Sequence, residues 1–286
     1  MKRQIIAAAA LGAMLLAACG DDEKSSDTTP VGDQTAAECA VGKTVTDGTL
    51  TIATGEPAFP PYIINDATPE DGLGFEAAIA MAVAAQLGFD AASVVWTRTA
   101  FDAAIAPGPK DFDFNLQQYT ITPERAEVVT FSQGYYTSSQ AIFGLADGAA
   151  ANATTLEDLK GLKIGVAAGT TSITYIEEVI QPDSEPLIFN DNASAKEALD
   201  SNQIDAIVSD LPTALYITAV EMEGTTVYGQ IEGSGTDEFG LLMAKDSTLA
   251  PCVDLALTEL KDSGELDAIT TTWMSEYVEA PVISLG

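Results

Sequence analysis

The chain has 286 residues, of which 47% are hydrophobic and 19% charged, a composition that supports a folded core. Lys and Arg number 12 against 43 Asp and Glu, and the resulting formal charge of −31 repels phosphate backbones, so nucleic acid is excluded as a partner. The sequence contains no histidine, which excludes Ser–His and Cys–His nucleophiles and every His-containing zinc site. No cofactor and no metal ion is expected.

The N-terminus has the form of an export signal. Lys2 and Arg3 precede an uncharged apolar run over residues 5–18, which with about 14 residues is too short to span a bilayer and is typical of a secretory signal peptide. The run ends in Leu-Ala-Ala-Cys-Gly, which looks like a bacterial lipobox. We predict that residues 1–18 are a lipoprotein signal peptide and that acylated Cys19 anchors the protein to the membrane surface. An ordinary signal peptide with an incidental cysteine is the alternative.

The segment after Cys19 is polar. Residues 20–38 are rich in Asp, Ser and Thr, so residues 19–38 are predicted to form a flexible, lipid-anchored tether outside the cytoplasm. Two cysteines remain, Cys39 and Cys252. In an oxidising compartment an even remainder indicates a disulfide, with two buried free thiols as the alternative.

The first half of the folded part alternates between short β-rich runs and helical stretches. A strand is predicted over residues 50–54, followed by an Ala-rich helix over residues 75–87 that Gly88 ends. Over residues 112–117 large apolar residues alternate with polar ones, as in a half-buried strand.

The second half begins at Thr155, where Thr-Leu-Glu-Asp resembles a capping box at a helix start. Further strands and helices are expected, the strands over residues 163–167 and 205–208 and the helices after residue 172, near 194–199, from Pro212, and around 251–261 and 266–277. Strand–helix alternation predicts an α/β fold, and the length suits two domains.

Arg125 is the first candidate binding residue. Apart from Arg3 in the predicted signal peptide, the chain has only Arg98 and Arg125. A guanidinium binds a carboxylate through two parallel hydrogen bonds, and Arg125 closely follows Thr120 and Thr122, which could add hydroxyls. The alternative is a surface arginine paired with a neighbouring glutamate.

Two further candidates follow predicted strands. Gly169-Thr170-Thr171-Ser172 joins a strand to a helix, and free N–H groups at a helix N-terminus can bind an anion. Asp210 follows the strand over residues 205–208, at the edge where open α/β sheets bind ligands. Its carboxylate could hold an ammonium, or it could cap the next helix.

Aromatic residues complete the inventory. Phe59 lies in a Pro-rich loop after the first strand, and Phe101 begins a helix after the strand containing Val95. Loop aromatics can form an apolar slot for a ligand side chain, although core packing is the alternative for each. Together with Arg125 and Asp210 they could bind an α-amino-acid zwitterion.

The order and spacing of these segments resemble the extracellular solute-binding proteins of family 3, the polar amino-acid receptors of ABC importers. The likeness covers residues 49–277 and is carried by residues 53–62, 74–76, 119–122 with Arg125, 131–132 with 135–136, 169–171, and 204–206 with Asp210. It implies a two-lobed type II periplasmic-binding-protein fold. Lobe 1 would span 45–136 and 237–286, and lobe 2 would span 141–230, with hinge strands near 136–141 and 230–235.

The resemblance also implies roles for individual residues. Arg125, helped by Thr120 and Thr171 beside Thr170, would bind the ligand α-carboxylate. Asp210 and the backbone of Gln118 would hold the α-ammonium. Phe59 and Phe101 would enclose the ligand side chain. The lobes would close over the ligand, and an ABC permease would distinguish the closed state of what is expected to be a monomer.

Two positions qualify the resemblance. The family signature usually carries a second acid after Gly74-Phe75-Glu76, where this chain has Ala78, which leaves the local helix packing open. Glu56 stands where relatives carry an acid that meets a basic ligand side chain, while Asn115 and Gln117 offer amides instead. Specificity for a cationic side chain or for Gln, Asn or Glu therefore stays open.

Two other functions are kept as hypotheses. An enzyme on the same scaffold, such as a dehydratase acting on a small carboxylate, would use Glu56 or Asp210 as general acid or base. The absence of histidine counts against it. A sensor subunit that reports ligand without transport would have the same sequence features as a transport receptor.

Overall fold

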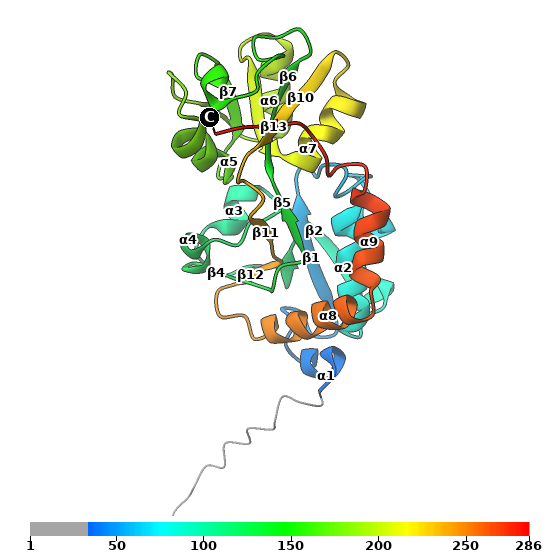
Figure 1. Ribbon diagram of the computed structural model, residues 1–286. Coiled ribbons are helices and arrows are strands. Elements are labelled where there is room, and N and C mark those ends of the chain that lie inside the picture. Colours follow the sequence, from blue (N-terminus) through cyan, green and yellow to red (C-terminus); the bar gives the residue numbers. More distant parts are fainter. Residues whose placement is uncertain (1–33, 286) are drawn as a thin grey trace, which may run out of the picture. The chain divides into compact units, whose positions relative to one another are not determined.

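The computed structural model describes residues 34–285. Two β-sheets, each with its own covering helices, form two α/β lobes, as Figure 1 shows. The α/β class predicted from the sequence is therefore confirmed. Within the described residues, no helix has both the length and the apolar character needed to cross a membrane.

The first lobe is built on a five-stranded sheet. Its strands, in sheet order, are β2 (Val94–Thr99), β1 (Leu50–Gly55), β3 (Phe114–Asn115), β12 (Leu242–Ala244) and β4 (Val129–Phe131). β1 is parallel to β2 and β3, and β12 is antiparallel to its two neighbours. The α-helices of this lobe are α1 (Ala36–Ala40), α2 (Phe75–Gln86), α3 (Phe101–Ile105), α4 (Pro123–Ala126), α8 (Ala250–Asp262) and α9 (Glu265–Met274), and the 3₁₀-helices are η1 (Pro69–Asp71) and η2 (Ala91–Ser93).

The second lobe is built on a six-stranded sheet. Its strands, in sheet order, are β13 (Val282–Ile283), β10 (Thr225–Ile231), β6 (Gln140–Leu145), β9 (Ala206–Asp210), β7 (Ile164–Ala167) and β8 (Leu187–Phe189). Its helices are α5 (Ser172–Thr174), α6 (Asn192–Asp200) and α7 (Leu211–Tyr216), with the 3₁₀-helix η3 (Leu156–Leu159) and the π-helical segments η4 (Tyr175–Ile180) and η5 (Ile217–Glu221). Thr155 and Asp158 form the predicted capping box at η3.

The central strand β6 shows why this sheet is buried on both faces. Ile142 packs in one apolar cluster of the lobe, while Ala141 and Phe143 pack in another. Because successive side chains of a strand point to opposite faces, an unbroken apolar run requires cover on both sides. The polar residue at the start of this run, Gln140, is also fully buried.

The lobes are joined by a short two-stranded sheet. β5 (Tyr136–Ser138) pairs antiparallel with β11 (Asp237–Phe239). β5 falls inside the hinge segment predicted at 136–141. The second connection lies further along the chain than the predicted 230–235, because β10 continues to Ile231 and β11 begins at Asp237.

The structure corrects the predicted domain boundaries at both ends. Residues 34–38 belong to the fold and not to the tether, because Thr35 caps α1 through a capping box with Glu38 and the helix buries Ala36 and Cys39. At the other end β13 pairs with β10 in the second sheet, so lobe 1 does not extend to residue 286. The predicted signal peptide, Cys19 and the tether up to residue 33 lie outside the described residues.

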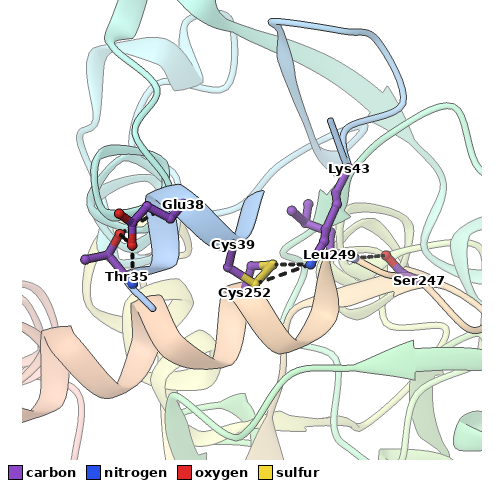
Figure 2. The surroundings of a disulfide bond; sticks show 7 residues. All are labelled: Thr35, Glu38, Cys39, Lys43, Ser247, Leu249 and Cys252. Carbon is purple, nitrogen blue, oxygen red and sulfur yellow. Dashed lines mark hydrogen bonds between the residues drawn. A yellow bond between two sulfur atoms is a disulfide. The ribbon is translucent and has the colours of Figure 1, made fainter. Parts of the chain in front are cut away.

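The predicted disulfide is confirmed, and the alternative of two free thiols is wrong. Cys39 of α1 is bonded to Cys252 of α8, with their Cα atoms 5.4 Å apart. Figure 2 shows the bond beside the N-terminal turn of α8. Lys43 places its Nζ atom 3.4 Å and 3.3 Å from the two sulfur atoms. The bond thereby fixes the first described helix against the first lobe.

Replacing both cysteines with serine is expected to lower the free energy of unfolding by about 2–5 kcal/mol, because the bond closes a loop with a sequence separation of 213. The melting temperature should fall by several degrees, since 1 kcal/mol corresponds to roughly 2–4 °C in a domain of this size. Differential scanning calorimetry measures the shift. As a control, dithiothreitol should lower the melting temperature of the wild type and leave the serine variant unchanged. A variant that melts with the wild type would contradict the expectation.

Candidate functional site

All the predicted ligand-binding residues line one cavity, whose walls come from both lobes. Its volume is about 380 Å³, within the range of about 300–1,000 Å³ typical of small-molecule sites. The predicted residues that line it are Glu56, Phe59, Phe101, Gln118, Thr120, Arg125, Thr170, Thr171 and Asp210. The structure thus brings the nine together, and their contact with a ligand stays a prediction.

Arg125 lies in α4, which begins with Pro123 after Thr122 as N-cap. Its side chain turns inward, with the residue only 9% exposed, so the alternative of a surface ion pair with a neighbouring glutamate is wrong. Nη1 donates to the carbonyl oxygen of Thr120 at 2.7 Å, and Nη2 donates to that of Gly169 in the other lobe at 2.9 Å. A guanidinium has five N–H donors, so three are left for a ligand. Burial lowers the pKa of Arg125 from its ordinary value, while the charges of Asp210 and Asp237 oppose that shift.

The aromatic wall beside Arg125 is held by stacking. The Phe101 ring lies against Tyr119, with ring centroids 4.5 Å apart, and the guanidinium carbon of Arg125 lies 5.5 Å from the Phe101 centroid. Tyr119 is fully buried and donates its hydroxyl to the carbonyl oxygen of Phe101 at 3.1 Å. Phe101 therefore packs on the core through one face and still lines the cavity. Phe59 reaches the same cavity from the Pro-rich loop.

Gln118 is held in place by Glu76, the last residue of the Gly74-Phe75-Glu76 motif. Gln118 has a positive φ of 53°, and its backbone N–H donates to the Glu76 carboxylate at 2.8 Å. The Gln118 side-chain amide and the Tyr135 hydroxyl also donate to that carboxylate. Burial raises the pKa of Glu76 to about 7, and these hydrogen bonds oppose the shift. The helix α2 forms without the second acid of the motif, which resolves the question left by Ala78.

Gly74 explains why that motif begins with glycine. Its φ is 115°, and a Cβ atom there would lie 2.4 Å from the carbonyl oxygen of Tyr62. A larger residue would push the Pro-rich loop away from the start of α2. The glycine therefore keeps the loop that carries Glu56 and Phe59 against Glu76 and its partners.

Asp210 ends β9 and directly precedes α7. It occupies the N-cap position, but its side chain makes no capping hydrogen bond, so the predicted alternative role is wrong. Oδ1 accepts a hydrogen bond from Gln140 Nε2 at 2.8 Å. Burial, with the nearby charge of Asp237, raises the pKa of Asp210 to about 8, against the opposing effects of Gln140 and Arg125. A cationic group in the cavity would lower this pKa again and so favour the ionised form of Asp210.

The turn before α5 supplies hydroxyl groups from the second lobe. The Thr171 Oγ1 atom lies 3.5 Å from the Thr120 Oγ1 atom and donates to Asp237 Oδ2 at 3.1 Å. Thr170 donates its hydroxyl to the carbonyl oxygen of Ala167 at 2.8 Å and so fixes the turn. The helix is short, with three α-helical residues before a π-helical segment.

Several polar residues near the site were not predicted from the sequence. Asp102 and the Asn190-Asp191-Asn192 turn line the cavity. Asp191 follows β8, so the strand-end argument used for Asp210 could have found it. Gln140 and Asp237 lie on the strands at the hinge, and no pattern in the sequence distinguishes them.

The strand over residues 112–117 also differs from its prediction. Only Phe114 and Asn115 form β3, and the polar positions are buried along with the apolar ones. Asp113 accepts hydrogen bonds from the backbone N–H groups of Val45 and Thr51 at 2.7 Å and 2.6 Å. Gln117 donates to Asn115 at 3.0 Å. The polar alternation therefore marks buried hydrogen bonds and not a solvent-facing side.

The described residues that line the cavity carry an excess of negative charge. Arg125 is the single basic residue among them, and the acidic ones are Glu56, Asp102, Asp191 and Asp210. Such a cavity favours a ligand with one carboxylate and more than one cationic group.

Comparisons with known proteins agree with this geometry. A model of the bacterial extracellular solute-binding proteins, family 3, matches residues 50–276. The L-cystine-binding protein TcyJ of Escherichia coli (strain K12) is 29% identical over 236 residues, which cover 81% of this chain and 84% of that protein.

Two solved structures of an ancestral arginine-binding protein are also similar. The one bound to arginine has 31% identity and a TM-score of 0.66, and covers 79% of this chain and 98% of its own. The one bound to glutamine has 32% identity and a TM-score of 0.67, and covers 80% and 98%. These matches confirm the two-lobed fold that the sequence resemblance implied.

Proposed function

Because the chain belongs to the bacterial extracellular solute-binding proteins of family 3, we propose that it binds a polar α-amino acid between its lobes and delivers it to an ABC permease. The observation that carries the proposal is the placement of Arg125 and Asp210 on the wall of one cavity. A guanidinium and a carboxylate match the two charged groups that every α-amino acid has. The relatives reported above are binding proteins by name, and no reaction is proposed.

Closure of the lobes would supply the signal for the permease. Arg125 of the first lobe already donates to Gly169 of the second, and Thr120 faces Thr171 across the same boundary. A ligand that contacts both sets stabilises the arrangement in which they are close together. The permease would then distinguish ligand-bound from ligand-free receptor by the relative position of the two lobes, with a monomeric receptor as the delivering unit.

The charge of the cavity supports a cationic amino acid as the ligand. Glu56, Asp102 and Asp191 remain after Asp210 is assigned to the α-ammonium. Replacing Glu56 with glutamine is therefore expected to weaken L-arginine binding about fivefold, or about 1 kcal/mol, and to change L-glutamine binding much less. Isothermal titration calorimetry with both ligands measures the two effects. The exposed Glu70, replaced by glutamine, serves as the control, and equal losses for both ligands would contradict the role of Glu56.

A thermal-shift panel of the common amino acids tests the proposed function. A ligand at 100 times its Kd stabilises the protein by about 2.7 kcal/mol, which raises the melting temperature visibly. At least one polar amino acid is expected to do so. No shift with any amino acid, or formation of product from prephenate or arogenate, would contradict the proposal.

The lipobox-like sequence supports a lipid anchor, which is part of the same proposal. Acylated Cys19 would hold the receptor at the outer face of the cell membrane, close to the permease. Replacing Cys19 with serine is expected to release the protein from the membrane fraction. Equal membrane association of the variant and the wild type would contradict the anchor.

A further inference from the structure

Gln140 joins two carboxylates at the boundary of the lobes. Its Nε2 atom donates to Asp210 Oδ1 at 2.8 Å and to Asp237 Oδ2 at 2.7 Å. The two oxygens therefore lie within two hydrogen-bond lengths of each other. Asp210 ends β9 in the second lobe, whereas Asp237 begins the hinge strand β11.

The orientation of the Gln140 amide is fixed. Its NH₂ group faces two carboxylates, which can only accept when ionised, and its Oε1 atom accepts a hydrogen bond from the Ser172 hydroxyl at 2.6 Å. The side chain is fully buried, and both of its N–H donors are used. Gln140 therefore has no further N–H group that could stabilise a second negative charge on the two acids.

Neither acid has a salt-bridge partner within residues 34–285. The ion pairs there are Arg98–Asp66, Lys160–Glu157 and Lys196–Glu221. Asp237 is only 4% exposed, and its other contacts are with hydroxyl groups, from Thr171 at 3.1 Å and Tyr175 at 3.5 Å. Two close carboxylates with no paired cation in such a place do not both ionise readily.

The surrounding groups do not remove this repulsion. The titratable groups that face the pair are Arg125 of α4, Glu76 of α2, Tyr62 of the Pro-rich loop, Tyr135, Tyr136 of β5 and Tyr175 of η4. Arg125 is the only cation among them, and Glu76 adds a further acid. Burial raises the pKa of Asp237 as well as that of Asp210.

We propose that Asp237 is a positioning residue that acts on the ligand site through Gln140. In the ligand-free protein, the Asp210–Asp237 pair keeps one proton. The ligand α-ammonium then takes the place of that proton beside Asp210. This inference rests on the proposed function, because it concerns how the same site accepts an amino acid.

The exchange balances in charge and protons. One ammonium enters as a cation, one proton leaves the carboxyl group for the buffer, and both carboxylates end up ionised beside a cation. The proton therefore competes with the ligand, and the affinity should rise with pH until the ligand-free pair is fully ionised. A pair without a retained proton would bind the ligand with little dependence on pH in this range.

Calorimetric titration with L-arginine at pH 7, in two buffers of different ionisation enthalpy, counts the released protons. The wild type is expected to release about one proton per ligand, because the pKa of about 8 lies above this pH. Asp237→Asn keeps a hydrogen-bond acceptor for Gln140 and removes the charge of Asp237, so it should release fewer protons than the wild type, while the burial of Asp210 remains. Between pH 6 and pH 8 the wild-type Kd should fall by up to about tenfold per pH unit, and that of the variant should change less.

Glu238→Gln is the matched control. Glu238 is the next residue on β11, and it is exposed. Its replacement removes the same charge from the same strand without touching Gln140. The control is expected to keep the wild-type proton release and pH profile. Equal proton release by wild type and Asp237→Asn would overturn the inference.

A second readout needs no ligand and so separates this inference from the proposed function. An extra proton held by the folded pair makes the wild type less stable as pH rises from about 4 to about 8, because the unfolded carboxyl groups ionise at lower pH. Asp237→Asn and Asp210→Asn should each flatten this fall in melting temperature, and the double variant should add nothing further. Identical pH profiles for wild type and single variants would overturn the inference even if L-arginine binds.

Discussion

Replacing Arg125 with alanine is expected to weaken amino-acid binding by at least about a hundredfold, or about 3 kcal/mol. Arg125 is the single basic residue among the described residues that line the cavity, and it is only 9% exposed. In the alanine variant a ligand carboxylate would lose both its positively charged partner and the two parallel N–H donors of the guanidinium. Arg125→Lys keeps the charge without the parallel donors, so its affinity should lie between those of the alanine variant and the wild type.

Isothermal titration calorimetry compares these proteins, and circular dichroism checks that each is folded. Lys160→Ala is the control, because Lys160 is a partly exposed cation paired with Glu157 and surface substitutions of this kind change stability little. An Arg125→Ala variant that is folded and binds within threefold of the wild type would contradict the carboxylate assignment.

Replacing Asp210 with asparagine is expected to weaken binding by about 2 kcal/mol or more, which is at least about thirtyfold. The loss follows because the variant keeps the shape of the side chain and its contact with Gln140 but cannot balance an α-ammonium. The wild type should also reject an analogue of the ligand that lacks the amino group, and Asp210→Asn should discriminate against it much less. Calorimetry with the amino acid and its deamino analogue measures both quantities.

Asp183→Asn is the control for this comparison. Asp183 lies in the second lobe and is exposed, so its replacement removes one negative charge away from the cavity. Its affinity for both compounds should equal that of the wild type. If Asp210→Asn kept the wild-type preference for the amino group, the ammonium would have to be held elsewhere.

The positions of Arg125 and Asp210 could be predicted because simple rules apply to both. A nearly arginine-free chain makes each arginine notable, and the end of a strand in an α/β sheet is a common place for ligands. The disulfide could be predicted for a similar reason, since only Cys39 and Cys252 remain after Cys19 is set aside. Those rules do not predict that the Arg125 side chain points inward or that the Asp210 side chain makes no hydrogen bond to the helix it precedes.

Other features depend on tertiary contacts and could not be predicted from the sequence. Residues 34–38 continue the polar segment, but the capping box of Thr35 and Glu38 begins α1 there, and the disulfide from Cys39 holds that helix against α8. β13 is only two residues long, and its place in the second sheet depends on pairing with β10. Asn115 and Gln117 look solvent-facing in the sequence, yet both are buried, Asn115 inside the first sheet and Gln117 on the wall of the cavity.

The pairing of Asp210 with Asp237 was equally hidden. Asp210 follows a predicted strand, whereas Asp237 lies outside every strand and helix that the sequence predicted. The two acids come together through β9 and the hinge strand β11, which pairs with β5. Gln140 precedes an apolar strand and carries no motif of its own. Buried polar residues that link separate elements are therefore found from their hydrogen bonds and not from local pattern.

The most direct measurement is calorimetric titration of the purified protein with L-arginine, L-glutamine and L-cystine at pH 7.5. We expect saturable binding of at least one of them, with one ligand per chain and no turnover of the ligand. Binding should be lost in Arg125→Ala, and L-arginine should bind more tightly than L-glutamine. A folded protein that binds none of the three, or that binds them equally well without Arg125, would show that this cavity is not an amino-acid site.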